Sequence, residues 1–227
     1  MTKNSLTPTE VSAGWELGYQ NHEGALWGEE AICILPDAVA ALMARGIRST
    51  VDVGCGDGRN LLQLCKHGLN CSGVDISATA LMRAGATLEA HGQSAFLIES
   101  DLERLPFASG TVESLVCFDV FGQLPTPLAA VAEFARVLKP GGLLFLNLYT
   151  PGDGTFGVGE RIEERAFLYK GTLFRYYDES DVRGLFGGWD VDDLRLLRWP
   201  DPPHGDFRPD AHEHESWVLQ VSAPQRG

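Results

Sequence analysis

Short apolar runs rich in β-branched residues recur along the chain, and amphipathic segments of helical period separate them. Uninterrupted apolar runs of this length are typical of parallel strands that are covered by helices on both faces. The pattern predicts strands at 47–53, at a run ending near 75, and at 94–99, 115–121, 143–149, 189–199 and 217–222. Between and before them it predicts helices at 8–20, 37–45, 59–67, 77–90, 126–138 and 178–186.

The helix boundaries have their own signals. Thr7, Pro8 and Glu10 form the pattern of a capping box with proline in the first turn. Gly46 and Gly68 stand where two of the helices should end, because glycine readily adopts the left-handed conformation that closes a helix. The alternation of strand and helix therefore predicts an α/β protein with a doubly wound, Rossmann-like sheet.

The two ends of the chain depart from simple alternation. Residues 1–46 are expected to form an N-terminal helical cap or lid, and residues 47–227 a single α/β core. Within that core, about 150–177 is glycine-rich and then mixed in charge, which predicts an insertion after the fifth strand. Glu160, Glu163 and Glu164 suggest a solvated helix face within it.

Composition narrows the function classes. The 227 residues have a formal charge of −13, which argues against a nucleic-acid partner, because phosphate binding depends on clustered Lys and Arg. The five cysteines show no C-x-x-C pairing, so reduced thiols and a cytoplasmic location are expected. No apolar segment approaches the length of a membrane span, and no signal peptide is apparent. Small-molecule substrates are favoured, and the sequence is silent on oligomeric state.

The run from Val51 to Gly58 reads V-D-V-G-C-G-D-G, which is a strand followed by a glycine turn. Glycines there allow positive φ and close approach of a ligand to the main chain. A dinucleotide fingerprint would place its last glycine at Arg59, and Asp57 would oppose a pyrophosphate. S-adenosylmethionine, with its sulfonium, ammonium and single carboxylate, suits Asp52 and Asp57 better than NAD does.

Two further carboxylates follow predicted strands at the same edge of the sheet. Asp75 lies about twenty residues beyond the glycines, the spacing of an acid that binds ribose hydroxyls. Asp101 follows the third predicted strand and could accept from an adenine amino group.

Four motifs in order, D-V-G-C-G-D-G, G-V-D-I-S, S-D-L-E-R-L-P-F and V-L-K-P-G-G-L-L-F, make the chain resemble the class I S-adenosylmethionine-dependent methyltransferases. The resemblance covers roughly residues 47–149, and Gly58-Arg59-Asn60 resembles the branch with tellurite-resistance and thiol methyltransferases. It implies a seven-stranded sheet of order 3-2-1-4-5-7-6. The cofactor-binding residues expected on the motifs and on this resemblance are Asp52, Gly54, Cys55, Gly56, Asn60, Asp75, Ile76, Asp101, Leu102 and Phe118. Asp119, beside Phe118, occupies the place where the family's chain passes beneath the sulfonium.

The reaction expected is in-line attack by a small-molecule acceptor on the methyl carbon. Such a reaction depends on positioning and desolvation, so a catalytic residue need not exist. If a base is used, the candidates are His22, His204, His212 and His214. The expected substrate-binding residues are Trp15, Tyr19, Trp27, Tyr176 and Tyr177, which would favour an apolar, flat or cationic acceptor.

Other possibilities remain open from the sequence. His212 and His214 share one face of an extended segment, but without further ligands at a defined spacing no metal site is predicted. The same cofactor could be consumed by intramolecular displacement at its methionine chain, or the protein could be a non-catalytic cofactor-binding subunit. The segment Gly122-Gln123-Leu124-Pro125 lacks the N-P-P-Y or D-P-P-Y motif that holds a planar amine in the families it resembles, which disfavours methylation of nucleobase or protein amide nitrogens. The acceptor atom itself stays undetermined.

Overall fold

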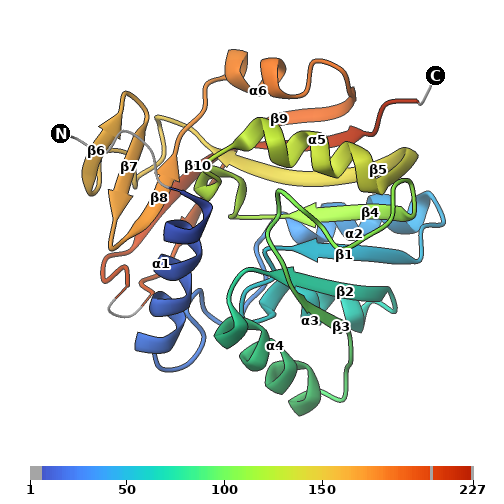
Figure 1. The fold of residues 1–227 in the computed structure, drawn as a ribbon, viewed down its shortest axis with the longest axis horizontal. Coiled ribbons are helices and arrows are strands. Elements are labelled where there is room, and N and C mark those ends of the chain that lie inside the picture. Colours follow the sequence, from blue (N-terminus) through green and yellow to red (C-terminus); the bar gives the residue numbers. More distant parts are fainter. Residues whose placement is uncertain (1–6, 205–206, 226–227) are drawn as a thin grey trace.

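The computed structural model describes residues 7–204 and 207–225. Its centre is a seven-stranded sheet of order β3-β2-β1-β4-β5-β10-β9 (Figure 1). Counted within this sheet alone, the order is 3-2-1-4-5-7-6, and the predicted doubly wound α/β fold is confirmed. The strands are β1 (Ser49–Val53), β2 (Asn70–Asp75), β3 (Phe96–Glu99), β4 (Val112–Cys117), β5 (Leu138–Tyr149), β9 (Asp190–Asp201) and β10 (His212–Ser222).

The first five strands are parallel, and β10 pairs antiparallel with both β5 and β9. Helices cover both faces of this sheet. The helices in the described part of the chain are α1 (Pro8–Asn21), α2 (Leu35–Ala44), α3 (Arg59–Lys66), α4 (Ala78–Ala90), α5 (Pro127–Val137) and α6 (Glu179–Leu185), and all of them except α1 pack on the sheet.

Neighbouring strand residues belong to different cores, as the strand period requires. Leu115 of β4 packs in a cluster with residues of α5 and α6, whereas the adjacent Val116 packs in a cluster with residues of α2, α3 and α4. Helix α2, although within the N-terminal segment expected to form a lid, contributes Leu35 and Leu42 to this second core. The sheet is therefore buried on both faces, which explains its continuous apolar runs.

Helix α1 lies apart from these layers, between α4 and a second sheet formed by the insertion (Figure 1). That sheet has the order β6-β7-β8, from β6 (Glu160–Glu163), β7 (Ala166–Tyr169) and β8 (Thr172–Arg175). The predicted capping box at the start of α1 is present: Thr7 accepts from the backbone of Glu10, whose side chain accepts in return. The helix face predicted for Glu160 and Glu163 is wrong, because those residues form β6.

Several strand boundaries also differ from prediction, three of them by four or five residues. β4 ends at Cys117, and Phe121 begins a short 3-10 turn, η1 (Phe121–Gln123). β5 begins at Leu138, before the Pro-Gly-Gly break, because Leu138 pairs with Val112 across an irregular register. β10 begins at His212, five residues earlier than position 217, and pairs with β9 along its whole length. Within the described part of the chain, none of the helices is both long and apolar enough to span a bilayer.

Candidate functional site

A cleft lies at the carboxyl ends of β1, β2 and β4, where α/β sheets bind ligands. The space between its walls is about 830 Å³, open solvent at its mouth included. The lining residues are Val11, Trp15, Tyr19, Trp27, Gly54, Cys55, Gly56, Asp57, Arg59, Asn60, Asp75, Ile76, Asp101, Leu102, Phe118, Asp119, Val120, Gln123, Leu124 and Pro125.

The glycine turn between β1 and α3 forms the floor of this cleft. Gly54, Gly56 and Gly58 all have positive φ, at 76°, 53° and 93°. A side chain on Gly54 would overlap Val120, and one on Gly56 would reach within 2.5 Å of the Tyr19 hydroxyl. Glycine is therefore required at both positions by conformation and by space, and the bare backbone is left for a ligand.

Asp75, the last residue of β2, fixes this turn to the neighbouring strand. Its Oδ2 accepts from the Gly56 amide at 2.8 Å, and its Oδ1 accepts from the Ser77 amide at 3.0 Å. Burial raises the pKa of Asp75 to about 6, although these amides favour the charged form. Each carboxylate oxygen has a second lone pair, so the group can still accept from a ligand in the cleft.

Asp52, on β1 just before the glycine turn, is buried at 1% exposure and does not line the cleft. Its Oδ2 is a buried polar atom with no hydrogen-bond partner among the described residues. Burial and the charge of Asp75 raise the pKa of Asp52 to about 7, and Arg59 acts in the opposite direction. Asp52, which the sequence predicted to bind the cofactor, therefore lies behind the glycine turn, and its Oδ2 has no hydrogen-bond partner among the described residues.

The turn also holds the N-terminal segment over the cleft. Asp57 Oδ2 accepts from the Leu26 amide at 2.8 Å, and Asn60 Oδ1 accepts from the Ile32 amide at 3.0 Å. Burial raises the pKa of Asp57, and the Leu26 amide opposes this. Asn60, expected to bind cofactor, therefore uses its carbonyl oxygen to position the chain that covers the cleft.

Asp119 lines the cleft but is not among the cofactor- or substrate-binding residues expected from the sequence. It has a φ of 60° and follows the end of β4. Its carboxylate accepts from Arg59 at 2.8 Å, from the Asn147 amide at 2.9 Å and from the Tyr149 hydroxyl at 2.9 Å. The available signal was its place after the fourth strand, but its partners come from segments distant in sequence.

Arg59 connects Asp119 to the N-terminal segment, because its other guanidinium nitrogen donates to the Trp27 carbonyl at 2.9 Å. The Arg59 and Asp119 side chains are only 14% and 15% exposed. Replacing Arg59 with methionine should lower the free energy of unfolding by about 3 kcal/mol, since a nearly buried carboxylate loses its partner. Chemical denaturation measures this.

The matched control is Arg183→Met. Arg183 is 61% exposed and pairs with Glu179 four residues away on α6, an interaction worth about 0.5 kcal/mol. Equal losses from the two substitutions would contradict the role given to Arg59.

Among the predicted substrate residues, Trp15, Tyr19 and Trp27 line the cleft. Tyr176 and Tyr177 do not line it. Both are buried: the Tyr176 hydroxyl contacts that of Thr155 at 2.8 Å, and Tyr177 packs in the core with Phe121. They follow β8 and anchor the inserted sheet, so their place in the fold gives them a packing role.

None of the four candidate histidines is among the lining residues of the cleft. His22 follows α1 as its C-cap residue. His204, His212 and His214 instead gather around Asp201 at the end of the β9–β10 hairpin. This cluster lies beside the cleft, since His204 contacts Trp27 with ring centroids 5.2 Å apart and Tyr149 stacks on His214 at 4.8 Å.

Part of the chain is similar to a known protein family. Residues 51–146 match the methyltransferase domain family. The ubiquinone biosynthesis O-methyltransferase of Xanthomonas campestris pv. campestris is 30% identical over 123 residues, which are 54% of this chain and 52% of that protein. The chain thus spans about half the length of the curated relatives it matches.

Two solved structures share the fold over nearly the whole chain. One comes from work on the conversion of a disulfide bond into a thioacetal group during echinomycin biosynthesis, with a TM-score of 0.70 at 16% identity, covering 96% of this chain and 94% of that one. The other is magnesium protoporphyrin IX methyltransferase from Synechocystis PCC 6803 with bound S-adenosylmethionine, with a TM-score of 0.64 at 18% identity, covering 94% and 95%. These likenesses confirm the predicted Rossmann-like fold, and the matched domain agrees with the resemblance to methyltransferases. Residues 51–146 of this chain are thus similar to the methyltransferase domain family.

Proposed function

We propose that this protein is an S-adenosylmethionine-dependent methyltransferase that acts on a small-molecule acceptor. The observation that carries the proposal is the pairing of the glycine turn with Asp75 at the edge of the cleft. A bare, positive-φ backbone and a buried acid at the end of the next strand suit a nucleoside with a single carboxylate.

The lining residues divide between the parts of this cofactor. Gly54 and Gly56 offer backbone to the methionine end, and Asp75 accepts from the ribose hydroxyls. Asp101 and Leu102 line the part assigned to adenine, with Asp101 held by the Glu103 amide at 2.9 Å. Phe118 supplies an apolar wall near the sulfonium position.

The cofactor supplies an electrophilic methyl group whose sulfonium charge disappears on transfer. The chain's part is to exclude water and to orient the acceptor. Trp15, Tyr19 and Trp27 form an aromatic wall from the N-terminal segment, and Leu124 and Pro125 extend the apolar lining. Asp119 is the carboxylate placed to hold an acceptor hydroxyl, thiol or amine, because it lines the cleft beside Phe118.

The acceptor favoured by this lining is a small, flat molecule with an apolar body, and aromatic faces also accommodate cationic groups. The net charge of −13 disfavours nucleic acid as the acceptor. All five cysteines are free thiols, and reduced thiols are compatible with the cytoplasmic location that we propose.

Calorimetric titration of the full chain with S-adenosylmethionine and with NADH tests the cofactor. We expect S-adenosylmethionine to bind and NADH to give no heat. Incubation of the loaded protein with a panel of phenols, thiols and amines, followed by mass spectrometry, then identifies the product.

The product distinguishes the remaining alternatives. S-adenosylhomocysteine with a methylated acceptor supports methyl transfer. Methylthioadenosine would instead indicate displacement at the methionine chain, and binding without either product would indicate a non-catalytic subunit. Binding of NADH in place of S-adenosylmethionine would overturn the proposal altogether.

A further inference from the structure

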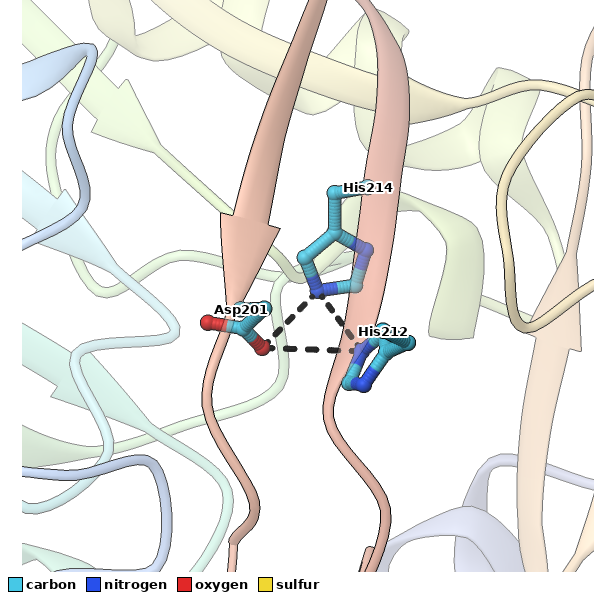
Figure 2. Close-up of side chains that lie close together, drawn as sticks. All are labelled: Asp201, His212 and His214. Atoms are coloured by element: carbon cyan, nitrogen blue, oxygen red, sulfur yellow. Dashed lines mark hydrogen bonds and ion pairs between the residues drawn. The ribbon is translucent and has the colours of Figure 1, made fainter.

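We propose that Asp201, His212 and His214 form a binding site for a divalent transition-metal ion of the zinc type, beside the cofactor cleft. The last residue of β9, Asp201, pairs in register with the first residue of β10, His212. His214 follows two residues later, so both imidazoles project from the same face of β10. Figure 2 shows the three side chains pointing toward one another from the two strands.

The three donor atoms form a nearly equilateral triangle. His212 Nε2 lies 3.3 Å from His214 Nε2, His214 Nε2 lies 3.1 Å from Asp201 Oδ2, and His212 Nε2 lies 3.5 Å from Asp201 Oδ2 (Figure 2). Zinc binds imidazole nitrogen and carboxylate oxygen at about 2.0–2.1 Å in tetrahedral geometry, which places its ligand atoms about 3.3–3.4 Å apart. The triangle already has the dimensions of one face of such a tetrahedron.

The hydrogen bonds around the triangle direct lone pairs into it. His214 Nδ1 donates to Asp153 Oδ2 at 2.8 Å, and His212 Nδ1 donates to the Asp210 carbonyl at 3.2 Å. In the neutral imidazoles, each Nε2 is then an unprotonated acceptor. Three acceptors at these distances repel unless a cation lies between them, and that cation is either a proton shared by His214 Nε2 and Asp201 Oδ2 or a metal ion.

The surroundings match those of known metal ligands. Metal-binding histidines usually donate their second ring nitrogen to a carboxylate or carbonyl, as His214 and His212 do here. Asp153 is itself held by the Glu215 amide at 2.9 Å, and Asp201 accepts from His204 at 2.5 Å. The triad side chains are only 8–15% exposed, so a bound ion would be largely shielded from water.

The donor set selects the class of metal. Two imidazoles and one carboxylate suit zinc and its neighbours in the first transition row, whereas magnesium and calcium prefer all-oxygen sites. Three protein ligands leave a fourth position of the tetrahedron open. His214 also stacks on Tyr149, whose hydroxyl donates to Asp119 in the cleft, so the site is one side chain away from the proposed acceptor position.

Metal titration of the full chain tests this site. The untagged protein is stripped with a chelator, then titrated with ZnCl₂ by calorimetry, and its metal content is measured by mass spectrometry. We expect one zinc per chain, a higher melting temperature with zinc, and a tetrahedral visible spectrum when Co²⁺ is used. His212→Ala should weaken zinc binding by more than about 100-fold, and Asp153→Asn by about 10- to 100-fold.

The matched control is His91→Ala, an exposed histidine at the end of α4, which should leave zinc binding unchanged. Circular dichroism verifies that each variant is folded. If His214→Ala fails to fold, His212→Ala and Asp201→Asn decide the question. The proposal is overturned if the stripped protein takes up no zinc, as when a single proton occupies the triangle instead. Zinc binding that persists at full strength in His212→Ala overturns it as well. Because these measurements need no methyl acceptor, they are independent of the proposed transferase activity.

Discussion

Replacing Asp75 with alanine should raise the Kd for S-adenosylmethionine by about 100- to 10,000-fold, which calorimetric titration measures. The carboxylate would accept from both ribose hydroxyls, and each hydrogen bond to a charged group contributes about 1.5–3 kcal/mol. The substitution also releases the glycine turn, because Gly56 and Ser77 lose the acceptor of their amides.

Two further variants separate ribose binding from general damage to the fold. Asp190→Asn removes an exposed acid at the start of β9 and should leave the Kd unchanged. Asp101→Ala, on the adenine side of the cleft, should raise the Kd by a smaller factor. An unaltered Kd in a folded Asp75→Ala protein would refute the assignment of the cleft to this cofactor.

The sequence was sufficient for the central fold because its signals are local. Continuous apolar strands, a capping box at Thr7 and a glycine turn each depend on a few adjacent residues. The insertion was less predictable. Glu160 and Glu163 lie on a short strand whose partner, β7, follows after a two-residue turn, and charged residues on a solvated edge resemble those on a helix face.

The residues of the cleft likewise include some that sequence motifs predict and some that only the structure brings together. Gly54, Gly56, Asp75, Ile76, Asp101, Leu102 and Phe118 were found from motifs at strand ends, and all of them line it. Asp119 accepts hydrogen bonds from Arg59, Asn147 and Tyr149, and Arg59 also donates to the Trp27 carbonyl. These residues are far apart in the sequence, so no spacing rule predicts their contacts. Tyr176 and Tyr177 were assigned as aromatic residues of the insertion that would wall the pocket, but both are buried and neither lines the cleft.

The proposed metal site of Asp201, His212 and His214 could not be predicted without the tertiary structure. His212 and His214 were recognisable as neighbours on one face, but their third partner, Asp201, lies on another strand. The orienting carboxylate, Asp153, comes from the loop after β5, and its distance in sequence from His214 conceals the pairing.

Replacing Asp52 with asparagine should stabilise the ligand-free protein, increasingly so as the pH rises. The pKa of Asp52 is raised from 3.8 to about 7, first by burial and then by the charge of Asp75. Between these two values the unfolded chain has lost the proton that the folded chain retains, so this group lowers stability as pH rises toward 7. The gain from the substitution should be near zero below pH 4 and reach about 4 kcal/mol above pH 7.

Urea denaturation of both proteins from pH 4 to pH 8 measures this difference, with Asp190→Asn as an exposed control that should show no such trend. A gain that is constant with pH would mean that Asp52 is not the titrating group. A carboxylate kept at such a cost, with Oδ2 unpartnered behind the glycine turn, is typical of a residue retained for function. The more stable Asp52→Asn protein should therefore bind S-adenosylmethionine less tightly. If it binds with undiminished affinity, Asp52 belongs to the structure of the turn and not to the cofactor site.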